Sequence, residues 1–382
     1  MTFVGLDLNS TRVSAVTGPA GAAPRELALD GQNLDYSMAL SLEGRHPEPG
    51  RAGAALCRRL PHLACLNFLP HVGDPHQWGN GRRRVDAEHA VSLVLERLQP
   101  ILAGVEGIGL ALPPYFGHVQ RERLAAIFDK MTVRRRAKLP PLLGTTAAPL
   151  AAVSAASAEQ VCSGLVLVGD VDDHALTWST VDAAGQEASL LTEQSLPQLN
   201  LRTWKGKLLD AVAERCIRQS RRDLRESGQA EQGLYDQFDA ALEACRQGRL
   251  IDLAIQGERW YQNLILRPDD FIDFSAALVR QAVDAVAVLA ATTMAGETIR
   301  TVLLTAAAGR LPGLATALEA KDFSVTTLPP EAVARGAHDV AVRVYRGDLP
   351  SGHFGSSLHL TASDAAAGPA YQRVISIRAV ER

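Results

Sequence analysis

The sequence lacks an uninterrupted apolar run long enough to cross a membrane. Its most apolar long stretch, Phe274 to Met294, contains Arg280 and Asp284, whose charges are too costly to place in lipid for an ordinary span. The first residues carry no basic region, and Asp7 interrupts the apolar run there, so we expect no secretory signal. No membrane partner is expected.

The sequence also has little excess charge. It contains 39 Lys and Arg residues against 42 Asp and Glu residues, a formal net charge of −3, so no global field favours nucleic acid or anionic lipid. Arginine runs at 82–84 and 134–136 are typical of solvated surface, because no aromatic residues are interleaved with them. The five cysteines are scattered and odd in number, which suits reduced thiols in a cytoplasmic protein.

Apolar material is plentiful, and it is arranged in a repeated pattern. Hydrophobic residues make up 47% of the 382 residues, which excludes disorder as the main state and leaves room for about two or three domains. An apolar strand with a carboxylate at its end, a turn and a second strand occur at residues 3–16 and again at 165–181. Two such hairpins about 160 residues apart indicate an internally duplicated α/β fold with a ligand cleft between the halves.

Apolar spacing and capping signals predict the other elements. One helix is expected to begin at Asp86, and a second is expected to run through Leu124 and Phe128. Further helices are expected over 147–156, 204–225, 234–247, 271–291 and 331–345, with buried strands at 108–112 and 302–304. Pro140, Pro141 and Gly144 predict a turn before the alanine-rich helix at 147–156. Asp269 or Asp270 is expected to cap the helix at 271–291.

The first turn has the chemistry of a phosphate site. Asn9, Ser10 and Thr11 offer consecutive backbone N–H groups and hydroxyls, and Asp7 lies on the strand just before them. Backbone N–H groups in such a turn attract anions, and a carboxylate can anchor a hydrated Mg²⁺. A turn of this kind is more often only a hairpin, so the pattern by itself leaves both interpretations open.

Six segments together resemble the nucleotide-binding domain of DnaK-type heat-shock chaperones, in the actin and sugar-kinase superfamily. The segments keep the family's order from residue 1 to about residue 345. Phe3–Val16 resembles the opening strand and first phosphate loop, Ala111–Phe116 with Gln120 and Arg121 resembles the "VPAYF…QR" segment, and Gly144–Leu150 resembles "EPTAAAL". Leu165–Thr177 resembles the second phosphate loop, Val302–Pro312 the adenosine motif, and Pro330–Ala337 the "DEAVAIGA" segment.

The resemblance implies a duplicated two-lobed actin-like ATPase fold, in which each lobe is a mixed five-stranded sheet with flanking helices. Residues 1–160 are expected to form lobe I, to which the helix at 331–345 returns, and residues 161–330 to form lobe II. Residues 346–382 are expected to be a C-terminal appendage, which leaves no room for the family's substrate-binding sandwich and helical lid.

The resemblance also implies a cofactor site, for ATP or ADP with Mg²⁺, in the cleft. Asp7 and Asp170 would face the metal through water, and the phosphates would lie between the two turns. Glu243 and Arg246 keep the spacing of the family's Glu and Lys that clamp the adenosine. The implied nucleotide-binding residues are Asp7, Asn9, Ser10, Thr11, Asp170, Asp172, Glu243, Arg246 and Arg310.

The second loop departs most from the family. Asp172, Asp173 and His174 replace three glycines, and Ala175 stands at the position of the catalytic threonine. At roughly 4–5 Å and an effective dielectric near 20, a carboxylate repels a phosphate by about 3–4 kcal/mol per charge pair. Leu69 aligns with the family's catalytic lysine, so the cation beside the γ-phosphate is also missing.

Further departures from the family weaken the adenosine and hinge motifs. Gly144 stands at the hinge glutamate, and Ala306 and Ala307 replace a glycine pair of the adenosine motif. Together with the losses in the second loop, these changes predict that ATP hydrolysis is absent or very weak.

Three functions remain open. The favoured one is a heat-shock-chaperone-like protein that does not hydrolyse nucleotide and acts by binding a protein partner or co-chaperone. The second is an ATP- or ADP-binding sensor, or a weak ATPase chaperone, since Asp7, Ser10, Thr11 and Asp170 remain. The third is a small-molecule kinase of the same superfamily, which has the least support because no carboxylate stands out as a base.

Overall fold

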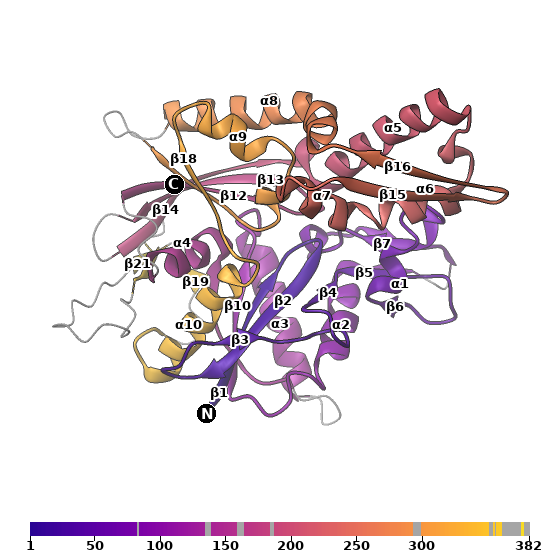
Figure 1. Cartoon of the computed structure of the whole chain (residues 1–382). Coiled ribbons are helices and arrows are strands. Elements are labelled where there is room, and N and C mark those ends of the chain that lie inside the picture. The colour runs from indigo at the N-terminus through magenta and orange to yellow at the C-terminus, as the bar shows by residue number, and fades with distance from the viewer. Residues whose placement is uncertain are drawn as a thin grey trace.

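Two mixed seven-stranded sheets organise this α/β protein. The computed structural model describes residues 1–81, 84–133, 139–158, 164–183, 187–292, 299–350, 354–355, 357–360 and 376–377. Figure 1 shows the two sheets one above the other, with the strands of the N-terminal sheet in the lower part of the view. In this described part, no helix combines the length and the apolar character that a membrane span needs.

The first sheet is built around β1 (Thr2–Leu8). It runs antiparallel to β2 (Arg12–Pro19) and parallel to β10 (Gly107–Leu112), beside which β11 (Leu142–Ala147) is also parallel. β3 (Arg25–Glu26) and β4 (Asp35–Ser37) both pair with β2. The hairpin predicted at residues 3–16 and the strand predicted at 108–112 are therefore confirmed.

The second sheet repeats this pattern around β12 (Gly164–Val171). It is antiparallel to β13 (Leu176–Ala183) and parallel to β17 (Thr301–Leu304), beside which β18 (Ser324–Thr327) is parallel. β14 (Glu187–Leu196) pairs with β13. In both sheets a central strand has its hairpin partner on one side and two parallel strands on the other, and the two hairpins are those that the sequence predicted.

The prediction of five strands in each sheet was wrong. In the first sheet both β3 and β4 pair with β2, and segments of the expected appendage add strands to both sheets. β19 (Phe354–Gly355) pairs with β11 of the first sheet, while β20 (Ser357–His359) pairs with β14 of the second and β21 (Ser376–Ile377) pairs with β20. Leu358 and Leu360 are buried among alanine and valine side chains of both halves. The chain end is thus part of the sheet structure.

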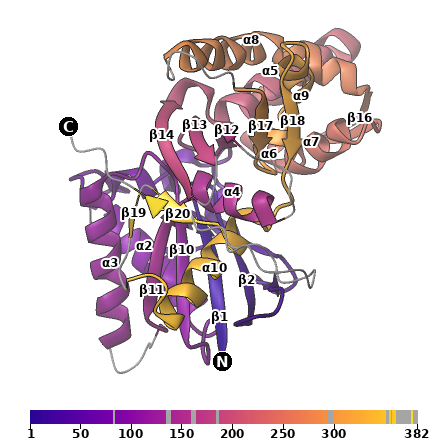
Figure 2. The same ribbon diagram turned by 90° about the vertical axis from the view of Figure 1, so that its left-hand side faces the viewer.

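α10 (Ala332–Arg346) packs directly on β1 and β10, and α4 (Ala148–Ala158) lies between α10 and the second sheet (Figure 2). The close approach depends on glycine. A Cβ at Gly5 would lie 2.0 Å from the carbonyl oxygen of Ala334, and one at Gly109 would lie 2.0 Å from that of Ala337. Because any side chain would collide there, the glycines let α10 sit on the sheet backbone.

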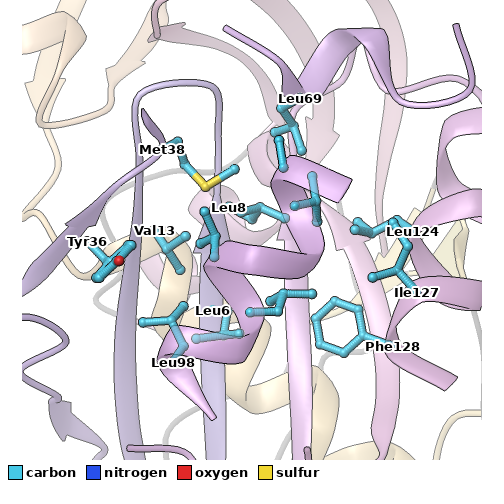
Figure 3. Packing of buried hydrophobic residues seen from close by; sticks show 14 of the residues in the cluster. Leu6, Leu8, Val13, Tyr36, Met38, Leu69, Leu98, Leu124, Ile127 and Phe128 are labelled. Carbon is cyan, nitrogen blue, oxygen red and sulfur yellow. The ribbon is translucent and has the colours of Figure 1, made fainter. Parts of the chain in front are cut away.

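The opposite face of the first sheet carries its hydrophobic core. Since side chains alternate along a strand, Leu6 and Leu8 point away from α10 and meet residues of α2 (Ala87–Leu98) and α3 (His118–Val133), such as Leu98 and Phe128 (Figure 3). The predicted cap of α2 is confirmed, because the Asp86 carboxylate accepts the His89 N–H at 2.8 Å.

Helices cover the second sheet, and a further unit of helices and one hairpin is inserted in the sequence between residues 220 and 268. α5 (Leu201–Ser220), α8 (Pro268–Thr292) and α9 (Leu314–Glu319) share a core with its strands. α6 (Gly228–Tyr235) and α7 (Phe238–Arg246) pack instead with the hairpin of β15 (Ile251–Gly257) and β16 (Trp260–Leu266). Figure 1 shows this hairpin projecting from the rest of the protein.

Several sequence predictions in this region need correction. The helix expected at 204–225 ends at Ser220, and the one expected at 234–247 is α7, which begins only at Phe238. α8 begins at Pro268, so Asp269 and Asp270 lie in its first turn rather than at its cap. The turn expected at Gly144 is strand β11, where the glycine leaves room for Val340 and Val344 of α10.

Short elements complete the described fold. They are α1 (Arg51–Ala54), the strands β5 (Ala39–Ser41), β6 (Glu48–Pro49) and β7 (Ala64–Leu66) of one small sheet, and the pair β8 (Gln77–Trp78) and β9 (Val85–Asp86). The short 3-10 helices are η1 (Pro61–Leu63), η2 (Leu69–His71), η4 (Pro197–Leu199), η5 (Leu224–Glu226) and η6 (Ala308–Arg310).

Candidate functional site

The β1–β2 turn and the β12–β13 turn meet and hydrogen-bond to each other. The backbone N–H of Ser10 donates to a carboxylate oxygen of Asp172 at 2.9 Å. In the other direction, the N–H of Asp173 donates to the hydroxyl of Thr11 at 2.8 Å. The two loops that the sequence analysis expected to enclose phosphates are therefore in direct contact.

The carboxylate of Asp172 is the centre of this contact. One oxygen accepts the N–H of Ser10 and the hydroxyl of Tyr115, at 2.9 and 2.5 Å, while the other accepts the N–H groups of His174 and Ala175, at 2.9 and 3.0 Å. The Asp172 side chain is buried, with 3% of its surface exposed. It thus uses backbone donors of both turns, which are the groups that hold an anion in such loops.

Asn9 stabilises its own turn. Its side-chain oxygen accepts the N–H groups of Thr11 and Arg12, each at 3.0 Å. Its φ angle is not positive, so a glycine is not required at this position for conformational reasons.

Asp7 and Asp170 are brought together beneath the turns. Burial, followed by the nearby charge of Asp170, raises the pKa of Asp7 to about 7. Burial also raises the pKa of Asp170, although the Thr305 hydroxyl, which donates to it at 2.6 Å, acts in the opposite direction. These buried carboxyls, with Asp172 close by, favour the protonated form of at least one member near neutral pH.

The residues present do not fit a nucleotide-bound Mg²⁺. Asp7 and Asp170 have suitable oxygen donors, but the described residues contain no group of three His, Cys, Asp or Glu side chains arranged to hold a metal ion. A Mg²⁺ ion near two carboxylates would complete its coordination with water and with phosphate oxygens of the nucleotide. The donors that would hold those phosphates are occupied by Asp172.

A cavity of about 450 Å³ opens beside the joined turns. It is bordered by Arg12 and Arg51 from the first half of the chain and by Arg202, Lys205 and Arg310 from the second. Its acidic lining residues are Asp35, Asp173, Asp236 and Asp239. Two ion pairs lie within the lining, Lys205 with Asp239 at 2.8 Å and Arg51 with Asp35 at 2.9 Å.

Glu243, Arg246 and Arg310 border a second cavity, of about 390 Å³, which shares Arg12 and Arg310 with the first. The Arg246 guanidinium donates to both carboxylate oxygens of Glu243, and this bonding lowers the pKa of Glu243. The fold therefore gathers all three residues in one place, but Glu243 and Arg246 are bonded to one another.

The positions at which the resemblance implied missing catalytic or nucleotide-binding groups lie in different parts of the structure. Leu69, the first residue of η2, is fully buried in the hydrophobic core to which α2 and α3 contribute, and it borders neither cavity. Ala175 is also buried, within the second turn. Ala307 borders the first cavity and Ala306 the second.

Sequence reasoning missed several residues of the site. Tyr115 lies within the Pro-Pro-Tyr-Phe segment, yet nothing in that segment indicates that its hydroxyl reaches Asp172. Arg12 directly follows the first turn and could have been found from its position alone. Lys205, Asp239 and Thr305 come from distant segments, and only the fold brings them to the cleft.

No protein-family model matches the chain, and no curated protein matches its sequence.

Proposed function

We propose that this protein is a two-lobed domain of the DnaK-type heat-shock kind that does not hydrolyse nucleotide and acts by binding a protein partner. The repeated order of parallel and antiparallel strands around β1 and β12 supports the two-lobed actin-like interpretation. α10, which follows the second sheet in the sequence and packs on the first, supports the same interpretation.

The observation that carries the proposal is the bonding of Asp172. Its carboxylate accepts backbone N–H groups from both turns and is buried between them. A triphosphate would have to displace this carboxylate and break four hydrogen bonds, and would then lie beside Asp7 and Asp170. Each bond to a charged group contributes about 1.5–3 kcal/mol, so this competition is unfavourable to nucleotide.

The hairpin β15–β16 supplies the support for a protein partner. Tyr261 and Ile265 lie on the same outer face of β16 and are 65% and 64% exposed. Leu250, just before β15, is 64% exposed. The opposite face of the hairpin packs in its own core. Large apolar side chains gathered on one projecting element are typical of a protein contact surface.

Calorimetric titration with ATP and ADP in the presence of Mg²⁺ tests the nucleotide half of the proposal. We expect no heat of binding at micromolar nucleotide for the natural protein. Asp172→Gly, which removes the competing carboxylate, is expected to raise the affinity for nucleotide above that of the natural protein. Micromolar binding by the natural protein would refute the proposal.

The partner half is tested by affinity capture from the cells that express the protein. Tyr261→Asp with Ile265→Asp is expected to lose a captured protein that the natural chain retains. Val288→Asp on α8 is the control, because Val288 is similarly exposed, at 59%, but lies away from the hairpin. Equal capture by all three chains would remove the hairpin from the proposal.

An ATP or ADP sensor is the second candidate function. It is favoured by the cavity that Glu243, Arg246 and Arg310 border, since these are the positions implied for adenosine. A sensor would bind nucleotide without hydrolysing it, so the same calorimetric titration separates the two candidates.

A further inference from the structure

Arg12 and Arg310 face the junction of the two cavities. Both side chains border the cavity of about 450 Å³ and the cavity of about 390 Å³. The charge of Arg12 is close enough to lower the pKa of Arg310, in addition to the effect of burial. Two guanidinium groups are therefore held near each other in a partly buried place, an arrangement that an anion between them would stabilise.

Neither guanidinium has a carboxylate of its own among the described residues. The acids whose charges act on Arg310 and raise its pKa are Asp239, Glu243 and Asp35. Asp239 is bound by Lys205 at 2.8 Å, Glu243 by both nitrogens of the Arg246 fork, and Asp35 by Arg51 at 2.9 Å. Each of these acids therefore already has a cation at hydrogen-bond distance.

The side chain of Arg310 has an unused donor. Its Nε–H is buried and has no hydrogen-bond partner in the described structure. Leaving a buried donor of this kind unsatisfied costs about 1–3 kcal/mol, which a bound acceptor would recover. The charge of Arg12 also acts on Asp7 and Asp170, but these buried carboxyls are not part of the cavity lining, whereas Arg12 is.

The larger cavity also has apolar side chains in its lining. Eight of its lining residues are apolar, among them Met38, Leu66, Val171 and Leu201. A site whose lining combines cations with apolar side chains selects a ligand with one anionic end and an apolar body.

We propose that the cleft binds a small organic anion, with a phosphate or carboxylate group held between Arg12 and Arg310 and an apolar body directed toward Met38 and Leu201. Such a ligand does not need the two turns, so it is compatible with Asp172 in its observed place. It would contact both halves of the chain and therefore stabilise the closed arrangement of the cleft.

The test compares three probes on the full chain: phenyl phosphate, benzoate and neutral benzyl alcohol, each at millimolar concentration. At a concentration of about ten times Kd, the anionic probe is expected to raise the melting temperature by about 2 °C, and the neutral probe to leave it unchanged. A response to phenyl phosphate alone identifies a phosphate ligand, and a response to benzoate alone identifies a carboxylate ligand. No greater response to either anion than to benzyl alcohol would overturn the proposal.

Arg12→Gln and Arg310→Gln are each expected to abolish the shift. Arg51→Gln is the matched control, since Arg51 borders the same cavity but is bonded to Asp30 and Asp35. Equal loss of the shift in Arg51→Gln would indicate a general charge effect and refute the site.

A measurement on the unaltered chain keeps the test valid if a variant fails to fold. On titration with the responding anion, the NMR signal of the Arg310 Nε–H is expected to move while that of Arg51 stays in place. Movement of neither signal would contradict the site. Micromolar binding of ATP would refute the proposed function but not this site, because the two are measured with different ligands and different variants.

Discussion

Replacing Asp172 tests whether one carboxylate holds the two turns together. In Asp172→Asn the retained oxygen can still accept the N–H groups of His174 and Ala175, as Oδ1 does now. The new amide nitrogen, however, faces the N–H of Ser10, so that one hydrogen bond is lost and two donors oppose each other. The Tyr115 hydroxyl can rotate to accept instead of donating.

The expected cost follows from these bonds. Losing the charge-assisted bond from Ser10 and weakening the one from Tyr115 together cost about 3–5 kcal/mol. Removing a buried negative charge beside Asp7 and Asp170 offsets part of this. We therefore expect Asp172→Asn to lower the free energy of unfolding by about 2–3 kcal/mol, and Asp172→Ala, which loses all four bonds, by about 4 kcal/mol.

Urea unfolding measures the change in stability, and hydrogen exchange at the Ser10 amide measures the contact itself. Exchange at Ser10 is expected to be at least about tenfold faster in Asp172→Asn. Asp252→Asn is the control, because Asp252 is exposed on β15, and we expect it to change stability by less than about 0.5 kcal/mol. Natural stability and unchanged Ser10 protection in Asp172→Asn would refute the role assigned to this carboxylate.

Three further predictions concern other parts of the protein. Because the pKa of Asp7 is raised from 3.8 to about 7, its contribution to stability is full below pH 4 and is lost as the pH rises through 7. Over that range the free energy of unfolding is expected to fall by about 4 kcal/mol in the natural protein, and Asp7→Asn is expected to remove this fall. Urea unfolding at each pH measures the difference, and parallel pH curves for the two proteins would contradict the prediction. Gly109→Val is expected to cost more than about 3 kcal/mol or prevent folding, since its Cβ would collide with α10, and a variant as heat-stable as the natural protein would disprove the close packing. Removing residues 351–382 takes away the buried Leu358 and Leu360 and is expected to lower the free energy of unfolding by about 3 kcal/mol. A chain that ends at residue 378 keeps both leucines and is the control. Equal melting temperatures for the two shortened chains would show that the segment adds no stability.

The elements that could be predicted from the sequence are those whose signals are local. The strand patterns of β1 and β12 and the capping signal at Asp86 depend on neighbouring residues, and the structure has all three. The turn predicted at Gly144 was wrong because a glycine in a strand can serve a helix that packs on it, and that helix is almost 200 residues away.

The site could be predicted only in part, for the same physical reason. The two turns and their acidic replacements are visible in the sequence, so excess negative charge at Asp172 was expected. That this side chain accepts bonds from both turns depends on how the two hairpins face each other. The pairing of Glu243 with Arg246 follows from their i,i+3 spacing on α7, whereas the proximity of Arg12 to Arg310 depends on the fold and is encoded by no spacing.

The paired chain end also sets a limit on movement. One residue separates β19 from β20 in the sequence, so the Cα atoms at positions 355 and 357 can be at most about 7 Å apart. Since β19 is bonded to β11 and β20 to β14, this short tether restrains the two sheet edges. A wider opening of the cleft has to break the hydrogen bonds of one of these two strand pairs. The β19–β11 pair has two residue pairs and the β20–β14 pair has three, so β19 would separate from its neighbour first.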